Sequence, residues 1–265
     1  MTEIISIANQ KGGVGKTTTA VNLSAALALE GKRVLLIDAD PQANATTSLG
    51  FHRDTYEYNI YHVMLGTKEL SEIILDSEIE NLKVAPSNIG LVGIEKEFYK
   101  NTKERELVLK RKIDPVKKDF DYIIIDSPPA LGPITINTLS ASTSVLIPIQ
   151  CEYFALEGLG KLLNTIKSVQ KIHNPNLDIE GLLLTMYDSR LRLSNQVVEE
   201  VQKHFNDMVF ETIIQRNIKL SEAPSFGESI INYDATSKGA SNYLNLAEEI
   251  IKKNGGNESL LLDWS

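Results

Sequence analysis

The segment "ANQKGGVGKTTTA" (residues 8–20) carries the residue types that bind a chain of phosphates. Its glycines let successive backbone N–H groups converge on phosphate oxygens, and the N-terminus of a following helix adds a favourable dipole. Lys16 would neutralise the β- and γ-phosphates, and the hydroxyl of Thr17 suits Mg²⁺. A glycine-rich turn that binds nothing is the alternative, but such a turn does not need the lysine and threonine. The segment therefore predicts a nucleotide phosphate site.

A second lysine, Lys11, stands directly before the glycine pair, where a phosphate loop does not need one. The general pattern G-x-x-x-x-G-K-[ST] would place glycine at position 10, where this chain has Gln10. Lys11 is either a solvated surface residue or a cation with its own function.

Three aspartates follow apolar runs that are typical of strands: Asp38 and Asp40 in "LLIDADPQ", and Asp126 in "DYIIIDSPPALG". Hydrolysis at a γ-phosphate needs a group that orients or deprotonates water, and a carboxylate at a strand end can reach that water. Asp126 fits a carboxylate that holds Mg²⁺ through water and Thr17. The alternative for Asp38 and Asp40 is a local turn cap before Pro41. Together with the phosphate loop, the three carboxylates favour a hydrolytic magnesium site.

The elements that must position these residues alternate between strand and helix. Such alternation predicts parallel βαβ units with right-handed crossovers, and therefore an α/β fold with a doubly wound, mostly parallel sheet, helices on both faces and the ligand at the carboxyl ends of the strands. We expect one domain over 1–265, with 51–120 less regular and mostly helical. The expected strands are 3–8, 32–38, 121–126, 144–149, 179–187 and 209–214, and the expected helices are 16–30, 155–173, 194–206 and 237–253.

Composition excludes several classes of protein. The net charge of −8 argues against nucleic-acid attraction by the whole surface, so any such binding must come from a local patch. No apolar run approaches the roughly 20 residues that cross a membrane, and the N-terminus shows no export signal, so we expect a cytoplasmic protein. One cysteine, Cys151, excludes an intramolecular disulfide and a cysteine-based metal cage, and the four histidines show no ligand spacing.

The loop K-G-G-V-G-K-T resembles the deviant Walker A motif of the ParA/MinD group of ATPases, which have a P-loop NTPase fold. The resemblance extends to ParA (Soj) partition ATPases through "DADPQANATTSLG", "IIIDSPPALGPITINTL", "TMYDSR" and "RNIKLSEAPSFG". It implies ATP and Mg²⁺ as cofactors, Lys11 reaching ATP held by the other subunit, Asp40 positioning water, and Asp38 supporting the magnesium shell. The catalytic residues it implies are Lys11, Lys16 and Asp40, and the metal residues are Thr17, Asp38 and Asp126.

The resemblance also assigns nucleotide contacts along the chain. The stretches "LLLTMYDSR" and "IQRNIKLSEAPSFG" resemble the two that flank the nucleotide base in this family. This chain has Gln215 where the family usually has proline. The implied nucleotide-binding residues are Lys11, Gly12, Gly13, Val14, Gly15, Lys16, Thr17, Thr18, Met186, Arg216 and Asn217.

The resemblance implies a homodimer that forms with ATP and binds double-stranded DNA without sequence preference. It also implies a ParB-type centromere-binding protein that stimulates hydrolysis, and a location on the nucleoid. DNA binding needs basic side chains on one surface, and a dimer doubles any such patch. Each of these lysines or arginines could instead be an ordinary solvated residue. The candidates are Arg190, Arg192, Lys203, Arg216, Lys219, Lys238, Lys252 and Lys253.

The nearest rival is a MinD-like switch that associates with membranes. That function needs a basic amphipathic C-terminal helix, whereas the end of this chain breaks at Gly255 and Gly256 and finishes acidic, which makes membrane binding the weaker hypothesis. Residues 255–265 are expected to form a C-terminal tail, with Trp264 as a docking residue. A nitrogenase iron-protein relative is excluded, because a cluster shared by two subunits needs two cysteines from each.

Overall fold

The computed structural model describes residues 1–100, 104–152 and 158–255. Its centre is a seven-stranded sheet with the strand order β3-β4-β2-β5-β1-β6-β7. All neighbours pair in parallel except β3 and β4. The strands are β1 (Glu3–Ile7), β2 (Val34–Asp38), β3 (Leu75–Asp76), β4 (Leu82–Ala85), β5 (Tyr122–Asp126), β6 (Ser144–Gln150) and β7 (Asp178–Thr185). The predicted fold class is therefore confirmed.

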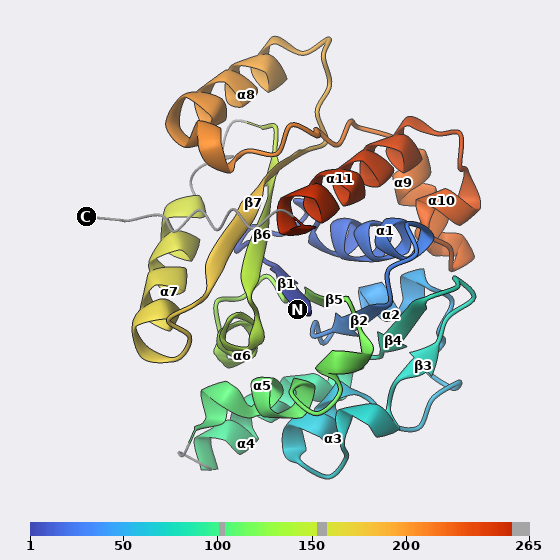
Figure 1. The fold of residues 1–265 in the computed structure, drawn as a ribbon, viewed down its shortest axis with the longest axis vertical. Helices are drawn as coiled ribbons and strands as arrows, with labels where there is room; N and C mark the ends of the chain where they lie inside the picture. Colours follow the sequence, from blue (N-terminus) through green and yellow to red (C-terminus); the bar gives the residue numbers. More distant parts are fainter. Residues whose placement is uncertain (101–103, 153–157, 256–265) are drawn as a thin grey trace.

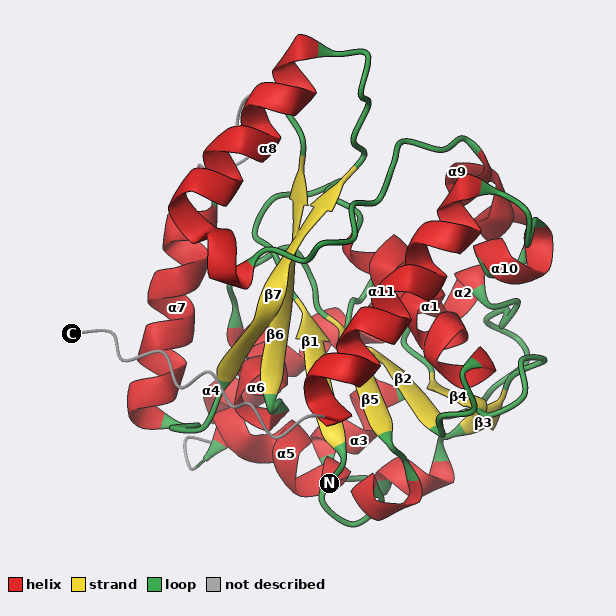
Figure 2. Ribbon diagram, turned by 45° about the horizontal axis from the view of Figure 1, so that its top comes forward, coloured by secondary structure: helices red, strands yellow, loops and turns green. Residues whose placement is uncertain are grey.

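Helices cover both faces of this sheet (Figures 1 and 2). The α-helices are α1 (Lys16–Leu29), α2 (Asn44–Ser48), α3 (Ile60–Leu65), α4 (Ile94–Lys100), α5 (Val108–Ile113), α6 (Pro133–Ala141), α7 (Leu159–Ile172), α8 (Arg192–Phe205), α9 (Lys219–Glu222), α10 (Ile230–Tyr233) and α11 (Lys238–Gly255). Short 3₁₀ turns are η1 (Leu70–Glu72), η2 (Ile89–Gly93), η3 (Arg105–Leu107), η4 (Lys117–Asp119), η5 (Asn206–Met208) and η6 (Ala223–Phe226).

The strands are apolar on both faces because each face has its own helical layer. Residues such as Leu36 and Ile124 face a core that contains α1 and α11, which lie side by side in Figure 1. Their neighbours Leu35 and Ile123 face a second core that contains α3 to α6. A third core joins β6 and β7 to α7 and α8.

Helix α1 begins directly after the phosphate loop and consists mostly of good helix formers. It ends where the sequence predicts, because Gly31 adopts a left-handed φ of +75° that suits a residue just past a helix C-terminus. Eleven of its fourteen residues are buried, so packing rather than propensity stabilises it.

One expectation about the elements was wrong, and one was incomplete. Segment 209–214 does not form a strand, and it runs beside β7 with only isolated bridges at Val209 and Gln215. The region 51–120 is mainly helical but also contributes β3 and β4, which extend the sheet beyond β2. The expected start of the helix at 155–173 and the tail 256–265 lie outside the described residues, and Gly255 is the last residue of α11. The single domain over 1–265 stays a prediction.

Candidate functional site

The phosphate loop connects the end of β1 to the start of α1. Gly13 and Gly15 both have a left-handed backbone, with φ of +74° and +89°, which side chains other than glycine rarely adopt. The hydroxyl of Thr185, the last residue of β7, donates to the carbonyl of Val14 at 2.9 Å. Strand β7 therefore helps to fix the loop, in addition to the strand and the helix that the loop connects.

Lys16 lies inside the loop with only 7% of its surface exposed. Its Nζ donates to the carbonyl of Lys11 at 3.1 Å. Burial lowers the pKa of Lys16, while the negative charges of Asp126 and Asp40 act in the opposite direction. The side chain is thus a desolvated cation at the mouth of the loop, which interacts more strongly with an anion than a solvated lysine does.

Strand β5 lies between β1 and β2, so it brings Asp126 between the phosphate loop and Asp38. Asp126 is the register partner of Ile7 on one side and of Asp38 on the other. The hydroxyl of Thr17 donates to Asp126 Oδ2 at 2.7 Å. Asp126 Oδ1 is buried and has no hydrogen-bond partner among the described residues. An unpaired buried carboxylate oxygen beside a threonine hydroxyl is a donor set that suits Mg²⁺.

Burial and neighbouring negative charges raise the pKa of both buried carboxyls. The pKa of Asp126 is raised well above its ordinary value by burial, and further by the charges of Asp38 and Asp40. Burial also raises the pKa of Asp38, to about 6, although three hydrogen bonds oppose the shift. A divalent cation at this position would favour the ionised forms of both groups. The residues present therefore fit a magnesium ion.

The backbone after β2 turns back over these carboxylates. Asp38 Oδ1 accepts a hydrogen bond from the Asp40 N–H at 3.1 Å, and Asp38 Oδ2 accepts two from Thr46. Asp40 Oδ1 accepts from the Gln42 N–H at 2.9 Å. The turn cap that was the alternative for these aspartates is thus present, on the same edge of the sheet as the phosphate loop.

The residues expected near the base come together from two segments. Met186 follows Thr185 and has a positive φ of 55°, which is uncommon for a residue other than glycine. The N–H of Arg216 donates to the carbonyl of Tyr187 at 2.9 Å, so 186–187 and 216–217 are neighbours. Asn217 accepts from the Lys219 N–H at 2.8 Å. Thr18 lies in the first turn of α1, half-buried.

Asn9 is a residue of this site that the sequence analysis did not identify. Its side-chain amide donates to the carbonyl of Pro148 in β6 at 2.7 Å, and its oxygen accepts from the Lys11 N–H at 3.0 Å. The side chain of Lys11 makes no hydrogen bond or ion pair with a described residue. The position of Asn9 next to "QKGG" was the available signal, but its contact with β6 needs the fold. Thr185 was missed for the same reason.

The basic residues proposed for DNA do not all have free charges. Three of the eight are ion-paired: Arg190 is held by Asp188 at 2.7 Å, Lys219 by Glu222 at 3.1 Å and Lys253 by Glu180 at 3.7 Å. The charge of Arg216 also acts on Asp188, which places Arg216 and Arg190 near one carboxylate. The other candidates, Arg192, Lys203, Lys238 and Lys252, are exposed and make no ion pair with a described residue.

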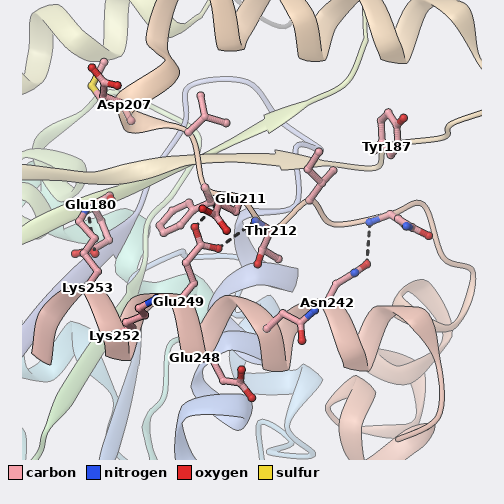
Figure 3. Close-up of a pocket in the computed structure, with 16 residues that line it drawn as sticks. Glu180, Tyr187, Asp207, Glu211, Thr212, Asn242, Glu248, Glu249, Lys252 and Lys253 are labelled. Carbon is pink, nitrogen blue, oxygen red and sulfur yellow. Dashed lines mark hydrogen bonds and ion pairs between the residues drawn. The ribbon is translucent and has the colours of Figure 1, made fainter. Parts of the chain in front are cut away.

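A groove of about 1230 Å³ lies between α11 and segment 207–215 (Figure 3). Its side chains carry more negative than positive charge, and Glu249 bridges it by accepting from the N–H groups of Glu211 and Thr212 at 2.7 and 3.1 Å. Lys252 and Lys253 line this groove, so their surroundings are acidic. The charged residues that line it are Glu180, Asp207, Glu211, Glu248, Glu249, Lys252 and Lys253.

Other chemistry is not supported in the described part of the chain. Cys151 is buried, and burial raises its pKa to about 12, which leaves the thiol unreactive at neutral pH. Histidine, cysteine and acidic side chains form no group of three that could hold a metal by themselves among residues 1–100, 104–152 and 158–255. Over the same ranges, none of the helices combines the length and the apolar character needed to span a bilayer.

Comparison with known proteins agrees with this geometry. A family model described as an AAA domain matches residues 2–179. The sporulation initiation inhibitor protein Soj of Bacillus subtilis is 55% identical over 250 residues, which cover 94% of this chain and 98% of that protein. The chromosome-partitioning ATPase Soj of Treponema pallidum is 47% identical over 255 residues, covering 96% and 99% of the two chains.

A solved structure with bound ligands has the same fold. Cobyrinic acid a,c-diamide synthase from Mycobacterium smegmatis, with a bound ATP analogue and magnesium, is 37% identical and superimposes with a TM-score of 0.85 over 97% of this chain and 98% of that chain. The cell division ATPase MinD of Pyrococcus furiosus is 28% identical, with a TM-score of 0.80 over 96% of this chain and 100% of that chain. With its phosphate loop, its buried carboxylates and these relatives, the chain belongs to the ParA and Soj family of chromosome-partitioning ATPases.

Proposed function

We propose that this chain hydrolyses ATP as the nucleotide-dependent switch of a chromosome-partitioning system. The observation that carries the proposal is the short bond between Thr17 and Asp126, beside an unpaired Asp126 oxygen and the desolvated Lys16. In this arrangement the loop would hold the phosphates of a nucleotide, and Thr17, with Asp126 through water, would hold its metal ion. Mg²⁺ would supply charge neutralisation for the β- and γ-phosphates.

Each residue then has a distinct role. Lys16 holds the phosphates by charge and the backbone from Lys11 to Thr18 holds them by hydrogen bonds. Thr17 would hold the magnesium ion, with Asp126 and Asp38 acting on it through water. Asp40 orients the attacking water, and removal of such a group costs about 10²- to 10⁴-fold in rate. Met186, Arg216 and Asn217 border the base.

We further propose that ATP brings two copies face to face. Lys11 has no partner within the described part of its own chain, and its backbone is fixed by Asn9. Its ammonium group can therefore reach the phosphates of the opposite copy without first breaking an internal ion pair. Gly12 beside it is exposed and leaves space for the close approach of a second backbone.

The ATP dimer is proposed to bind double-stranded DNA without sequence preference, and a ParB-type centromere-binding protein to stimulate hydrolysis and release. Arg192, Lys203, Arg216 and Lys238 are the better DNA candidates, whereas Arg190 and Lys219 are already held by Asp188 and Glu222. Lys252 and Lys253 are weaker, because the groove around them is acidic and Lys253 is already paired. The expected location is the cytoplasm, on the nucleoid.

One experiment tests this function directly. The affinity of the purified full chain for a random-sequence duplex is measured with ATP, with ADP and without nucleotide, at several salt concentrations. We expect tight binding only with ATP and magnesium, and a steep loss of affinity with salt, because phosphate contacts release counterions. Equal binding in all three nucleotide states would contradict the proposed switch.

A further inference from the structure

Thr46 connects the buried carboxylate of Asp38 to the segment that follows β4. Its N–H and its hydroxyl both bond to Asp38 Oδ2, at 2.8 and 2.7 Å. The N–H of Ser87, just beyond the end of β4, donates to the same hydroxyl at 3.0 Å. Thr46, Asp38 and Ser87 are all fully buried.

The direction of these bonds is fixed by the donors that are available. A backbone N–H can only donate, so Ser87 occupies an acceptor site of the Thr46 oxygen. The single hydroxyl proton of Thr46 is then free to point only at Asp38. The carboxylate accepts two bonds on Oδ2 and one, from the Asp40 N–H, on Oδ1. A carboxylate has about four acceptor sites, so Asp38 keeps about one for anything else.

We propose that Thr46 is a positioning residue for ATP hydrolysis. By fixing the plane of the Asp38 carboxylate, it aims the remaining acceptor site at the magnesium shell. Asp38 accepts a hydrogen bond from the Asp40 N–H. Thr46 therefore also sets where the Asp40 carboxylate stands relative to the attacking water. This inference rests on the proposed roles of Asp38 and Asp40.

The competing explanation is that Thr46 only stabilises the short helix α2, in which it is the third residue. The two explanations predict different kinetics. A structural role would reduce the amount of folded protein without changing the behaviour of each folded molecule. A positioning role would change the turnover of folded protein and leave ATP binding intact, because Thr46 makes no hydrogen bond to the phosphate loop.

The test compares Thr46→Val, which keeps the shape and removes the hydroxyl, with Thr46→Ser, which keeps the hydroxyl. Thr47→Val is the matched control, because Thr47 is on the same helix but is exposed, and among the described residues its hydroxyl donates only to the carbonyls of Ala43 and Asn44. Steady-state hydrolysis gives kcat and KM, and electron paramagnetic resonance of Mn²⁺ with bound ADP gives the metal affinity. Outer-sphere partners of metal sites are worth about 10- to 100-fold in activity or metal affinity.

For Thr46→Val we expect kcat and Mn²⁺ affinity to fall by about 10- to 100-fold, with KM for ATP within about twofold of the parent. Thr46→Ser should return both values to within about threefold, and Thr47→Val should match the parent. If Thr46→Val does not fold, Thr46→Ala is measured in its place. Unchanged kcat and metal affinity in a folded variant without the hydroxyl would overturn the inference, as would a Thr46→Ser variant as impaired as Thr46→Val.

Asp38→Asn, measured in the same way, separates this inference from the function on which it rests. If Asp38→Asn is impaired and Thr46→Val is not, Asp38 acts without help from Thr46 and the inference fails. If Asp38→Asn itself behaves like the parent, the proposed role of Asp38 fails first.

Discussion

The carboxylates of Asp38 and Asp126 project from register partners on two neighbouring parallel strands, β2 and β5. Both are fully buried; burial raises the pKa of each, and the charge of Asp38 adds to the shift of Asp126. The two aspartates stand at the carboxyl edge of the sheet, where the phosphate loop also opens. A nearby positive charge is needed to keep both carboxylates ionised, and the expected magnesium ion would supply it.

Gly12→Val should abolish ATP-dependent dimerisation while the monomer still binds ATP. A Cβ at Gly12 would meet no heavy atom within 4 Å in the monomer, so the valine is accommodated there and obstructs only a second chain. Light scattering after size-exclusion chromatography, with and without ATP, measures the mass. Gly255→Val is the matched control, since a Cβ there also has open space. A Gly12→Val protein that still doubles its mass with ATP would contradict the face-to-face dimer.

Asp40→Ala should slow hydrolysis by about 10²- to 10⁴-fold and accumulate ATP-bound dimer on DNA. The reason is that the phosphate loop and the Thr17–Asp126 pair remain intact, so binding persists when water is no longer oriented. Phosphate release and DNA binding are measured on the same sample. Asp54→Ala, at an exposed aspartate, is the control. Normal turnover in Asp40→Ala would remove Asp40 from the mechanism.

Arg216→Ala should weaken DNA binding and make it less sensitive to salt. The slope of the logarithm of affinity against the logarithm of salt concentration should become shallower by about 0.9 for each DNA phosphate that the variant no longer neutralises. Lys253→Ala should have no comparable effect, because its ammonium group is paired with Glu180 and lies in an acidic groove. Fluorescence anisotropy of a labelled duplex across a salt series compares the two variants. An equal decrease in affinity for both would mean that the DNA surface includes the end of α11.

Glu180→Gln should make stability less dependent on pH. Burial raises the pKa of Glu180 above its unfolded value, although Lys253 and Ser144 oppose the shift. The folded protein therefore holds a proton that the unfolded chain releases, and stability falls as pH rises from the unfolded pKa through the folded pKa. Glutamine carries no proton to lose, and its oxygen can still accept from Ser144.

The measurement for Glu180 is the Tm from circular dichroism at several values from pH 4 to pH 8. We expect the parent to lose more Tm than Glu180→Gln as pH rises through this interval. Glu248→Gln, at an exposed glutamate of α11, controls for the loss of one charge. A parent and Glu180→Gln with parallel Tm curves would show that this carboxyl does not titrate on unfolding.

The parts of the fold that were predictable from sequence are those set by local pattern. Continuously apolar runs such as 121–126 predicted the central strands, because a strand covered on both faces must be apolar on both. The phosphate loop predicted its own position between a strand and a helix. Strand β4, "LKVA", was missed because it is short and has the exposed Lys83 inside it, and only its pairing with β2 makes it a strand.

Segment 209–214 shows the opposite error. Its composition favours a strand, but the N–H groups of Glu211 and Thr212 bond to Glu249 of α11 instead of to another strand. In the candidate site, Thr17, Asp38 and Asp126 could be predicted to lie at one edge of the sheet because their types and spacing are restrictive. Asn9, Thr46 and Thr185 could not be identified, because each is bonded to a distant segment that has no local signature.

The contacts between α1 and the C-terminal helices limit which fragments of the protein can fold. The hydroxyls of Thr19 and Tyr243 lie 3.2 Å apart, Asn22 accepts from the Ile230 N–H at 2.7 Å, and both links are buried between α1 and the C-terminal helices. A recombinant fragment that stopped at residue 179, where the AAA-domain match ends, would expose the apolar side chains of α1 that pack on α10 and α11. The end of the AAA-domain match is thus not the boundary of an autonomous folding unit, and expression trials need the chain through α11.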